Sequence, residues 1–185
     1  MTKTEARKLA KACRAAVDLH TVGHAMAGVL FTLPAWQHAD TVLAFASMPD
    51  EPDTADILRQ ALAEGKRLLL PRVLSRTEMD WVEITALSQL QPGAYGILEA
   101  PASLPAFDTA HLGDGALALI PCLAASPDGV RLGRGGGYYD RFLAHYKGRR
   151  LLVCPTAALL GDLPCEGWDV RFSPHEILTE KGTLL

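Results

Sequence analysis

The sequence has few cysteines, and none of them lie in a recognisable metal or disulfide pattern. Cys13, Cys122, Cys154 and Cys165 are widely spaced and form no Cys-x-x-Cys pair. A dense disulfide framework or a cysteine zinc site normally brings its cysteines close together in sequence or in regular spacings. We therefore expect four reduced thiols in the core of an intracellular protein.

Long apolar runs are also missing. The longest, 116–125, is about half the length needed to cross a bilayer, and Pro121 interrupts it. The first residues, 2–8, are too polar for the apolar core of a secretory signal. These absences predict a soluble, cytoplasmic protein with no membrane partner.

Neither charge nor aromatic content favours nucleic acid as a partner. The formal net charge is −3, and aromatic residues make up 6% of the chain. Binding along a nucleic-acid backbone needs a strong positive field, usually with aromatic platforms for the bases. The sequence also lacks Gly-x-Ser-x-Gly, and its six histidines are spread along the chain. Any anion site must therefore come from local clustering of cations.

What the sequence does contain is a regular alternation of apolar runs of strand length with helical segments. With 185 residues, 49% of them hydrophobic and 21% charged, the chain is predicted to form one globular domain over residues 1–185. The expected strands are Thr41–Ala46, Arg67–Val73, Met79–Ile84, Ala116–Pro121, Arg150–Cys154 and His175–Thr179. The expected helices are Lys3–Asp18, His20–Leu33, a helix capped by Asp53 or Thr54 that runs to Glu64, and Tyr138–Tyr146.

This alternation predicts an α/β fold with a mainly parallel sheet flanked by helices. Ligands of such sheets bind beyond the carboxyl ends of the strands. The loops after Ala46, Val73, Pro121 and Cys154 should therefore lie along one edge.

The most distinctive stretch is glycine-rich and basic. Gly135, Gly136 and Gly137 are adjacent, and Arg131 and Arg134 precede them. Without Cβ atoms, the three backbone amides can form a concave anion nest, and the expected helix after them would present its positive end. The alternative is an ordinary glycine turn before a surface helix, but three glycines beside two arginines favour the anion site.

A second basic cluster lies on the first expected helix. Four cations fall within an arc of about 80°, and the apolar residues are expected on the opposite side. The cations are Lys3, Arg7, Lys11 and Arg14, and the apolar residues are Leu9, Ala12, Cys13, Ala16 and Val17. Periodicity leaves two interpretations open, a solvated basic face or an anion site.

The segment Arg131–Asp140, Arg-Leu-Gly-Arg-Gly-Gly-Gly-Tyr-Tyr-Asp, closely resembles the signature of the 5-formyltetrahydrofolate cyclo-ligase family, also called methenyltetrahydrofolate synthetase. It fits neither the dinucleotide motif, because Tyr138 replaces the third glycine, nor a P-loop. Further segments resemble the family along nearly the whole chain. They are Leu70–Arg72, Met79–Trp81, Gly96–Glu99 and Leu163–Asp169.

The resemblance implies a role for particular residues. Those implied to bind ATP are Lys3, Arg7, Arg131, Leu132, Gly133, Arg134, Gly135, Gly136, Gly137, Tyr138 and Tyr139. Those implied to bind the folate are Ala46, Glu51, Arg134, Gly135, Gly136, Gly137 and Tyr138. Arg134, Lys3 and Tyr139 are the implied catalytic residues, and Asp140 and Asp169 would bind Mg²⁺. From the residues alone, Glu51 fits better as part of an acidic loop, with Asp50 and Asp53, near a helix N-terminus.

Other positions carry weaker expectations. Arg72 is a candidate phosphate ligand after a strand, and Tyr95 matches an aromatic position beside the ligand. Met79 and Trp81 fit the core better than a stacking platform. Ala158 stands where the family usually has glutamine, which leaves the contacts to the nucleotide base open.

The resemblance implies an ATP-dependent, Mg²⁺-requiring ligase that converts 5-formyltetrahydrofolate into 5,10-methenyltetrahydrofolate and releases ADP and phosphate. We expect a monomer or weak homodimer whose partners are ATP and the folate. Two rival hypotheses stay open. One is another ATP-dependent phosphotransferase or ligase with a different acceptor, and the other is a regulator that binds nucleotide or RNA through its basic helix.

Overall fold

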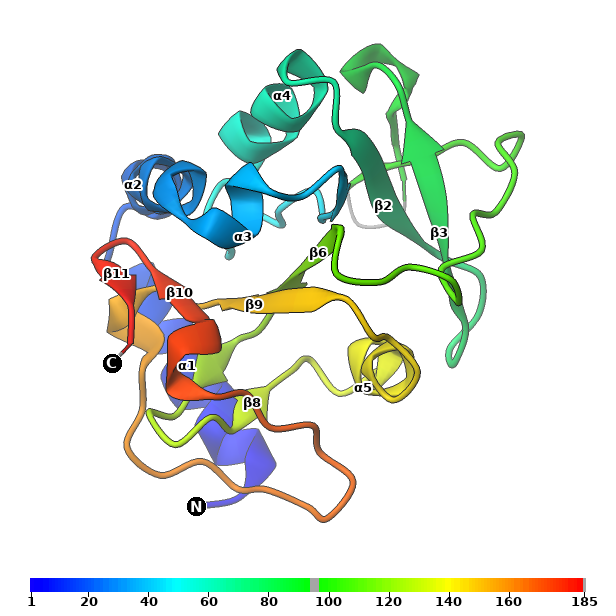
Figure 1. Cartoon of the computed structure of the whole chain (residues 1–185). Helices are drawn as coiled ribbons and strands as arrows, with labels where there is room; N and C mark the ends of the chain where they lie inside the picture. The colour runs from blue at the N-terminus through cyan, green and yellow to red at the C-terminus, as the bar shows by residue number, and fades with distance from the viewer. Residues whose placement is uncertain (94–96, 185) are drawn as a thin grey trace.

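The computed structural model describes residues 1–93 and 97–184. In this part of the chain, a seven-stranded sheet lies between two layers of helices and loops (Figure 1). In spatial order its strands are β11 (Gly182–Thr183), β10 (Ile177–Thr179), β9 (Arg149–Val153), β6 (Ala116–Pro121), β1 (Thr41–Leu43), β2 (Arg67–Val73) and β3 (Met79–Ile84). The pairings from β10 through β9, β6 and β1 to β2 are parallel, and β11 and β3 add antiparallel edges. The predicted α/β fold is confirmed.

The central strand β6 is apolar throughout because both faces of the sheet are covered. Along β6, Leu117 and Leu119 belong to one core cluster, whereas Ala118 and Ile120 belong to the other. This alternation follows from the period of two in an extended strand. Since neither face meets water, the strand shows no polar residues to mark the alternation, as expected for a buried parallel sheet.

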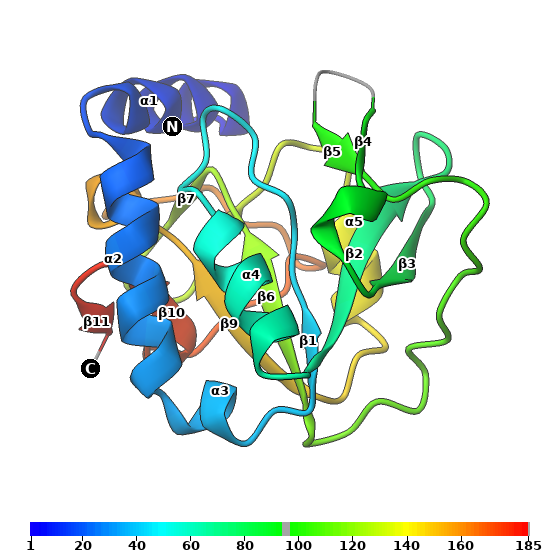
Figure 2. The same cartoon turned by 90° about the horizontal axis from the view of Figure 1, so that it is seen from above.

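Three helices cover the first face (Figure 2). They are α2 (Leu19–Thr32), α3 (Pro34–Gln37) and α4 (Ala55–Ala63). Asp18 caps α2 by accepting a hydrogen bond from the backbone of His20, and Pro34 occupies the first turn of α3. The carboxylate of Asp53 accepts from the amide of Ala55 at the start of α4. Local capping rules therefore account for each of these helix starts.

The opposite face carries α1 (Lys3–Ala15) and α5 (Tyr138–Leu143) (Figure 1). A capping box between Thr2 and Glu5 begins α1. The predicted orientation of this helix was wrong. Its buried residues are Ala6, Ala10 and Arg14, and Leu9 is 44% exposed. The side of α1 that carries Arg14 therefore packs on the protein, Lys3 and Arg7 are half-buried beside it, and Lys11 is exposed.

Several element boundaries differ from expectation. The first strand ends at Leu43 rather than Ala46, and α5 ends at Leu143 rather than Tyr146. The last expected strand starts at Ile177, because Pro174–Glu176 forms a 3-10 turn. Two small two-stranded ribbons were not predicted. They pair β4 (Gln91–Pro92) with β5 (Leu98–Glu99), and β7 (Ala124–Ala125) with β8 (Arg131–Leu132).

The expectation of four core thiols holds only for two of the cysteines. Cys122 and Cys154 are buried, and burial raises the pKa of the Cys154 thiol. Cys13 is half-buried and Cys165 is exposed. All four are free thiols in the structure. Across the described ranges, no helix has the length and apolarity needed to span a bilayer.

The order of the strands creates a switch point between β1 and β6. From β1 the chain moves outward to β2 on one side, and it later returns to β6 on the other side before continuing to β9. The loops that follow β1 and β6 therefore leave the sheet in opposite directions. A crevice opens at such a point in open parallel sheets, and ligands bind there.

Candidate active site

A cavity of about 740 Å³ lies at this switch point. Its wall includes Met48 and Glu51 from the loop after β1, together with Pro121 and Cys122 at the end of β6. The glycine-rich stretch, the basic face of α1 and the turn 166–169 complete the wall. Segments from both ends of the chain thus meet at the edge where the sequence predicts ligands.

The cavity brings together almost every predicted site residue. Lys3, Arg7 and the whole run 131–139 line it. Glu51, Asp140 and Asp169 do so as well. One predicted residue is not brought there: Ala46 is half-buried and packs against the core cluster under α2 and α4. Apart from Ala46, the residues predicted for the site therefore line one cavity.

The glycine loop has the backbone conformation that its composition predicts. Gly135 and Gly137 adopt positive φ angles of 102° and 68°, which residues with a Cβ rarely adopt. A Cβ on Gly135 would lie 3.3 Å from the guanidinium of Arg7. Glycine thus permits both the turn and the close approach of a cation. The following helix α5 is only six residues long, so its dipole adds less positive potential than a full helix would.

Two cations of α1 reach the glycine loop and the C-terminal turn. Arg7 donates from Nε to the carbonyl of Gly133 at 3.1 Å. Lys3, one helical turn earlier, contacts Glu166 at 2.6 Å and Asp169 at 2.9 Å. Burial on its own would lower the pKa of Lys3, but these two carboxylates outweigh it and raise the pKa. Lys3 is therefore fully charged at neutral pH.

Asp140 and Asp169, the predicted Mg²⁺ ligands, are both held by cations. Asp140 pairs with Arg131 at 2.7 Å. Burial favours a higher pKa for Asp169, but the backbone amide of Glu166, Lys3 and Arg131 together lower it. Among residues 1–93 and 97–184 there is no group of three or more His, Cys, Asp and Glu side chains that could hold a metal. Two carboxylates therefore face the cavity with cations as their partners.

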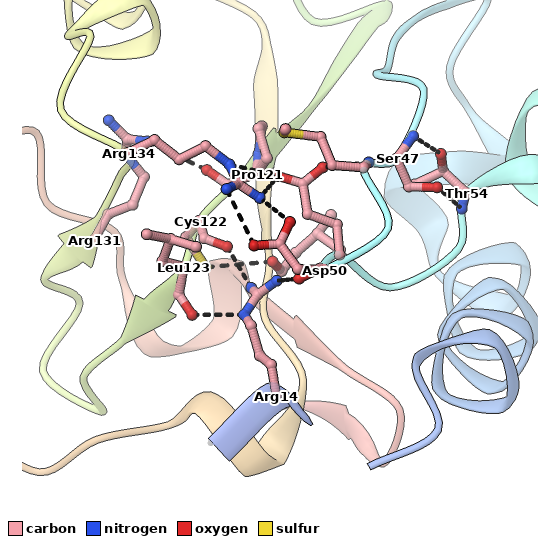
Figure 3. Close-up of polar contacts among 12 residues, drawn as sticks. Arg14, Ser47, Asp50, Thr54, Pro121, Cys122, Leu123, Arg131 and Arg134 are labelled. Atoms are coloured by element: carbon pink, nitrogen blue, oxygen red, sulfur yellow. Dashed lines mark hydrogen bonds and ion pairs between the residues drawn. The ribbon is translucent and has the colours of Figure 1, made fainter. Parts of the chain in front are cut away.

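Arg134 and Glu51 also line the cavity wall, and Figure 3 shows Arg134 close to Asp50. Arg134 contacts Oε1 of Glu51 at 3.1 Å and also pairs with Asp50. The second oxygen of Glu51 accepts from the amide of Met48 at 3.0 Å. Burial would lower the pKa of Arg134, but the two carboxylates outweigh burial and raise this pKa. Burial would raise the pKa of Asp50, but Arg134 outweighs burial and lowers that pKa. The buried carboxylate of Glu51 is thus fixed from both sides.

The buried guanidinium of Arg14 supports this wall from below, a role that sequence reasoning missed (Figure 3). It donates to the carbonyls of Leu123 and Asp50, each at 2.7 Å, and to that of Cys122. These carbonyls belong to the two loops that separate at the switch point. Arg14 therefore fixes the floor of the cavity and does not reach the ligand itself. Spacing along α1 placed Arg14 in the basic stripe, but no local signal distinguishes a carbonyl clamp from an anion ligand.

The two tyrosines of the signature have different environments. The hydroxyl of Tyr138 donates to the carbonyl of Ser75 at 2.8 Å, and its ring lies under the guanidinium of Arg141. Burial and the negative charge of Glu51 raise the pKa of Tyr139. Its phenol is therefore protonated at neutral pH and suited to donate a hydrogen bond, not to accept a proton as a base.

The remaining candidates lie away from the cavity. Arg72 was predicted as a phosphate ligand, but it pairs with Asp80 at 2.6 Å and donates to the carbonyls of Pro101 and Leu104, so it braces a loop instead. Trp81 is buried against α5, as predicted. Tyr95 lies outside the described residues. Ala158 is fully buried in the core.

An apolar rim was not predicted. The side chains of Met48, Val73, Ile97 and Trp168 line the cavity together with the charged residues. Val73 and Trp168 are 52% and 74% exposed. The sequence signal for the rim was weak, because exposed apolar residues after strands or in turns have no distinctive spacing.

The comparisons with known proteins agree on one family. The model of the 5-formyltetrahydrofolate cyclo-ligase family matches residues 2–180. The chain belongs to this family. Its sequence is 30% identical over 150 residues to the 5-formyltetrahydrofolate cyclo-ligase of Mycolicibacterium smegmatis, covering 77% of this chain and 75% of the relative. It is 31% identical over 154 residues to that of Escherichia coli K12, covering 80% and 84%.

Solved structures of similar proteins share this fold. The 5,10-methenyltetrahydrofolate synthetase of Aquifex aeolicus superposes with a TM-score of 0.82 at 26% identity, over 99% of this chain and 92% of the other. The corresponding protein of Mycoplasma pneumoniae shares the fold with a TM-score of 0.73 at 20% identity, over 97% and 99%. The family signature Arg131–Asp140 thus lies where the shared fold has its switch point.

Proposed function

We propose that this cyclo-ligase family member uses ATP to convert 5-formyltetrahydrofolate into 5,10-methenyltetrahydrofolate, with release of ADP and phosphate. The observation that carries the proposal is the cavity itself. It combines a glycine loop and clustered cations at one wall with a buried carboxylate, Glu51, at the other. A phosphate donor and a ring system with several N–H groups are the two ligands that such walls suit.

The contacts along the wall divide the cavity into two chemically different parts. Lys3, Arg7 and the glycine loop form one continuous cationic side, joined by the bond from Arg7 to Gly133. Glu51 accepts hydrogen bonds and lies on the far side of Arg134. We assign the cationic side to the phosphates of ATP and Glu51 to the N–H donors of the pterin. Arg134 lies between them, where the phosphoryl group would be transferred.

The proposed reaction begins with attack of the formyl oxygen on the γ-phosphorus. An O–P bond forms, the bond to the β-phosphate oxygen breaks, and ADP leaves. The N5 lone pair then stabilises the activated carbon as an iminium, N10 adds to it and loses its proton to water, and the C–O bond breaks to release phosphate. Transfer of a phosphoryl group calls mainly for positioning and for positive charge around its oxygens. Lys3, Arg7, Arg131 and Arg134 provide that charge.

The protein neutralises three of these cations with its own carboxylates. Lys3 pairs with Glu166 and Asp169, Arg131 with Asp140, and Arg134 with Asp50 and Glu51. Phosphates that bind here must therefore compete with carboxylates for the same donors. Binding becomes favourable when the displaced carboxylates acquire another cation.

Mg²⁺ suits that role, and the donor set fits it. Mg²⁺ binds one or two protein carboxylates and completes its coordination with phosphate oxygens and water. Asp140 and Asp169 line the cavity and would hold it, and the buried Nε of Arg131, beside Asp140, has no hydrogen-bond partner in the described part of the chain. When bound, Mg²⁺ neutralises charge that develops on the phosphate oxygens.

The test is ATP hydrolysis measured with and without 5-formyltetrahydrofolate, together with the absorbance of the methenyl product. We expect ADP only when the folate is present, in equal amounts with the product, because the formyl oxygen is the acceptor. Equal ADP release with and without the folate would refute the proposal and favour a different acceptor. Salt-sensitive RNA binding without ATP turnover would favour the regulator.

A further inference from the structure

The tryptophans of this protein differ sharply in exposure. Trp36 and Trp81 are 1% and 3% exposed, whereas Trp168 is 74% exposed. Tryptophan is usually well buried, since its large ring gains much from leaving water. Trp168 also lines the main cavity. We therefore expect this exposed indole at the cavity wall to contact a bound ligand.

The backbone holds Trp168 firmly in this position. It lies in a tight turn in which the amide of Asp169 donates to the carbonyl of Glu166 at 3.0 Å. In return, the amide of Glu166 donates to the carboxylate of Asp169 at 2.8 Å. Lys3 of α1 forms salt bridges with both acidic side chains. The turn 166–169 is thus held by two internal hydrogen bonds, and two salt bridges connect it to α1, which carries the cationic stripe.

A series of contacts also relates the turn that carries the indole to the rest of the site. Starting from the turn, Lys3 comes first, and Arg7 follows one helical turn along α1, about 6 Å away. Arg7 contacts the glycine loop, and Arg134 of that loop contacts Glu51. Along this series of contacts, the turn bearing Trp168 stands at one end and Glu51 at the other, with the cations assigned to the phosphates between them.

The chemistry of this end points to a nucleobase. A ligand whose phosphates lie among Lys3, Arg7 and the glycine loop has its base beyond them, on one side or the other. On the Glu51 side the pterin is already assigned. On the other side the turn offers a flat aromatic surface, and aromatic rings bind bases of any identity by stacking. Ala158, at the position left open for base contacts, is buried and offers none.

We propose that Trp168 is the platform on which the adenine ring of ATP stacks, with Lys3 fixing the turn that carries it. This assignment rests on the proposed use of ATP and adds the residue that binds its base. Because the base is held by stacking, the site should distinguish ATP from a bare polyphosphate far better than it distinguishes one purine from another.

The experiment compares ATP with inorganic tripolyphosphate, which has the phosphates but no base, in Mg²⁺-containing buffer. Affinities are measured by calorimetry for the wild type, Trp168→Ala and Trp168→Phe. We expect Trp168→Ala to weaken ATP about tenfold, since stacking contributes roughly 1–3 kcal/mol per base. Tripolyphosphate affinity should stay within about twofold, and Trp168→Phe should retain most of the ATP affinity. Leu9→Ala, which removes an exposed apolar side chain of α1 that the cavity lining does not include, is the matched control.

Fluorescence gives an independent readout. ATP should quench the emission of the wild type, tripolyphosphate should not, and the quenching should disappear in Trp168→Phe, where only the buried tryptophans remain. Equal loss of ATP and tripolyphosphate affinity in Trp168→Ala would overturn the proposal and make the turn a support for Lys3. A raised KM for the folate with unchanged ATP affinity would overturn it as well. Folate-dependent ADP release in the wild type is scored separately, so failure of the cyclo-ligase assignment is distinguishable from failure of the stacking.

Discussion

Glu51 has partners within the protein at the same carboxylate that is assigned to the ligand. Glu51 accepts from Arg134 and from the amide of Met48, although its assigned partner is the pterin. Asp50 holds the same arginine but does not belong to the cavity lining. Substituting Glu51 therefore tests a ligand contact, whereas substituting Asp50 tests only an ion pair within the protein.

The first prediction uses that difference. Glu51→Gln should raise the KM for 5-formyltetrahydrofolate about tenfold, because a hydrogen bond to a charged acceptor contributes roughly 1.5–3 kcal/mol. The KM for ATP should change by less than about twofold, since Asp50 still holds Arg134. Asp50→Asn is the control and should leave the folate KM near the wild-type value. Similar changes for both substrates in Glu51→Gln would assign Glu51 to loop architecture.

A second residue-scale prediction concerns Asp140, which serves either α5 or Mg²⁺. A carboxylate in the first helical turn contributes only about 0.3–1 kcal/mol to stability through the dipole. As an ion ligand it matters mainly to turnover. Asp140→Asn should therefore keep the melting temperature within a few degrees and lose most activity, with partial rescue at higher Mg²⁺. Asp169→Asn should behave similarly but more mildly.

Activity measured against Mg²⁺ concentration tests this directly. Asp162→Asn, an exposed carboxylate outside the cavity lining, serves as the control and should follow the wild-type curve. An unchanged Mg²⁺ dependence in both Asp140→Asn and Asp169→Asn would remove the two carboxylates from the metal site.

At the scale of elements, α1 combines two functions on one face. Its first two cations line the cavity, whereas Arg14 is buried and binds three loop carbonyls. The helix therefore supplies ligands at its start and fixes the floor of the site near its end. Replacing residues along this face should affect ligand binding at one end and stability at the other.

The third prediction follows from this division. Lys3→Ala and Arg7→Ala should each weaken ATP binding about tenfold, as expected when a charged donor to phosphate is lost. Each should lower the free energy of unfolding by about 1 kcal/mol or less, since partly exposed ion pairs contribute little. Lys8→Ala, on the exposed face of the same helix, is the control and should change neither quantity. A sharp fall in melting temperature with unchanged ATP affinity would make the stripe structural.

At the scale of the whole molecule, Lys3 ties the N-terminal helix to a turn near the C-terminus. Its partner Asp169 has a lowered pKa in the folded protein: burial opposes this shift, but the Glu166 amide and Lys3 outweigh burial. A carboxyl group with a lowered folded-state pKa adds stability that is fully present above its ordinary pKa, near 4. That stability is lost as the pH falls through the lowered value.

The fourth prediction is therefore a change in the pH dependence of unfolding. Between pH 6 and pH 3 the wild type should lose about 1 kcal/mol more stability than Asp169→Asn, which lacks the titrating group. Chemical denaturation at the two pH values measures the difference. Asp114→Asn, an exposed carboxylate before β6, is the control and should keep the wild-type loss. Parallel losses in wild type and Asp169→Asn would show that the tie contributes nothing to folding.

Much of the molecule follows from local sequence. The buried strands, the helix caps and the glycine turn depend on residues that are neighbours in the chain, so their chemistry can be recognised without a structure. Gly135 and Gly137 adopt positive φ where the sequence predicts a nest. The α/β alternation and the location of the site at the carboxyl ends of the strands follow in the same way, because parallel strands must end together.

Only the tertiary structure decided which surfaces meet. The acceptors of Arg14 lie 36, 108 and 109 residues away, so periodicity along α1 could not reveal that this cation is buried or that its neighbours Ala6 and Ala10 face the sheet. The turn bearing Trp168 comes to Lys3 across more than 160 residues of chain. A residue's periodicity and type are properties of its own segment, whereas its partners are properties of the packed whole.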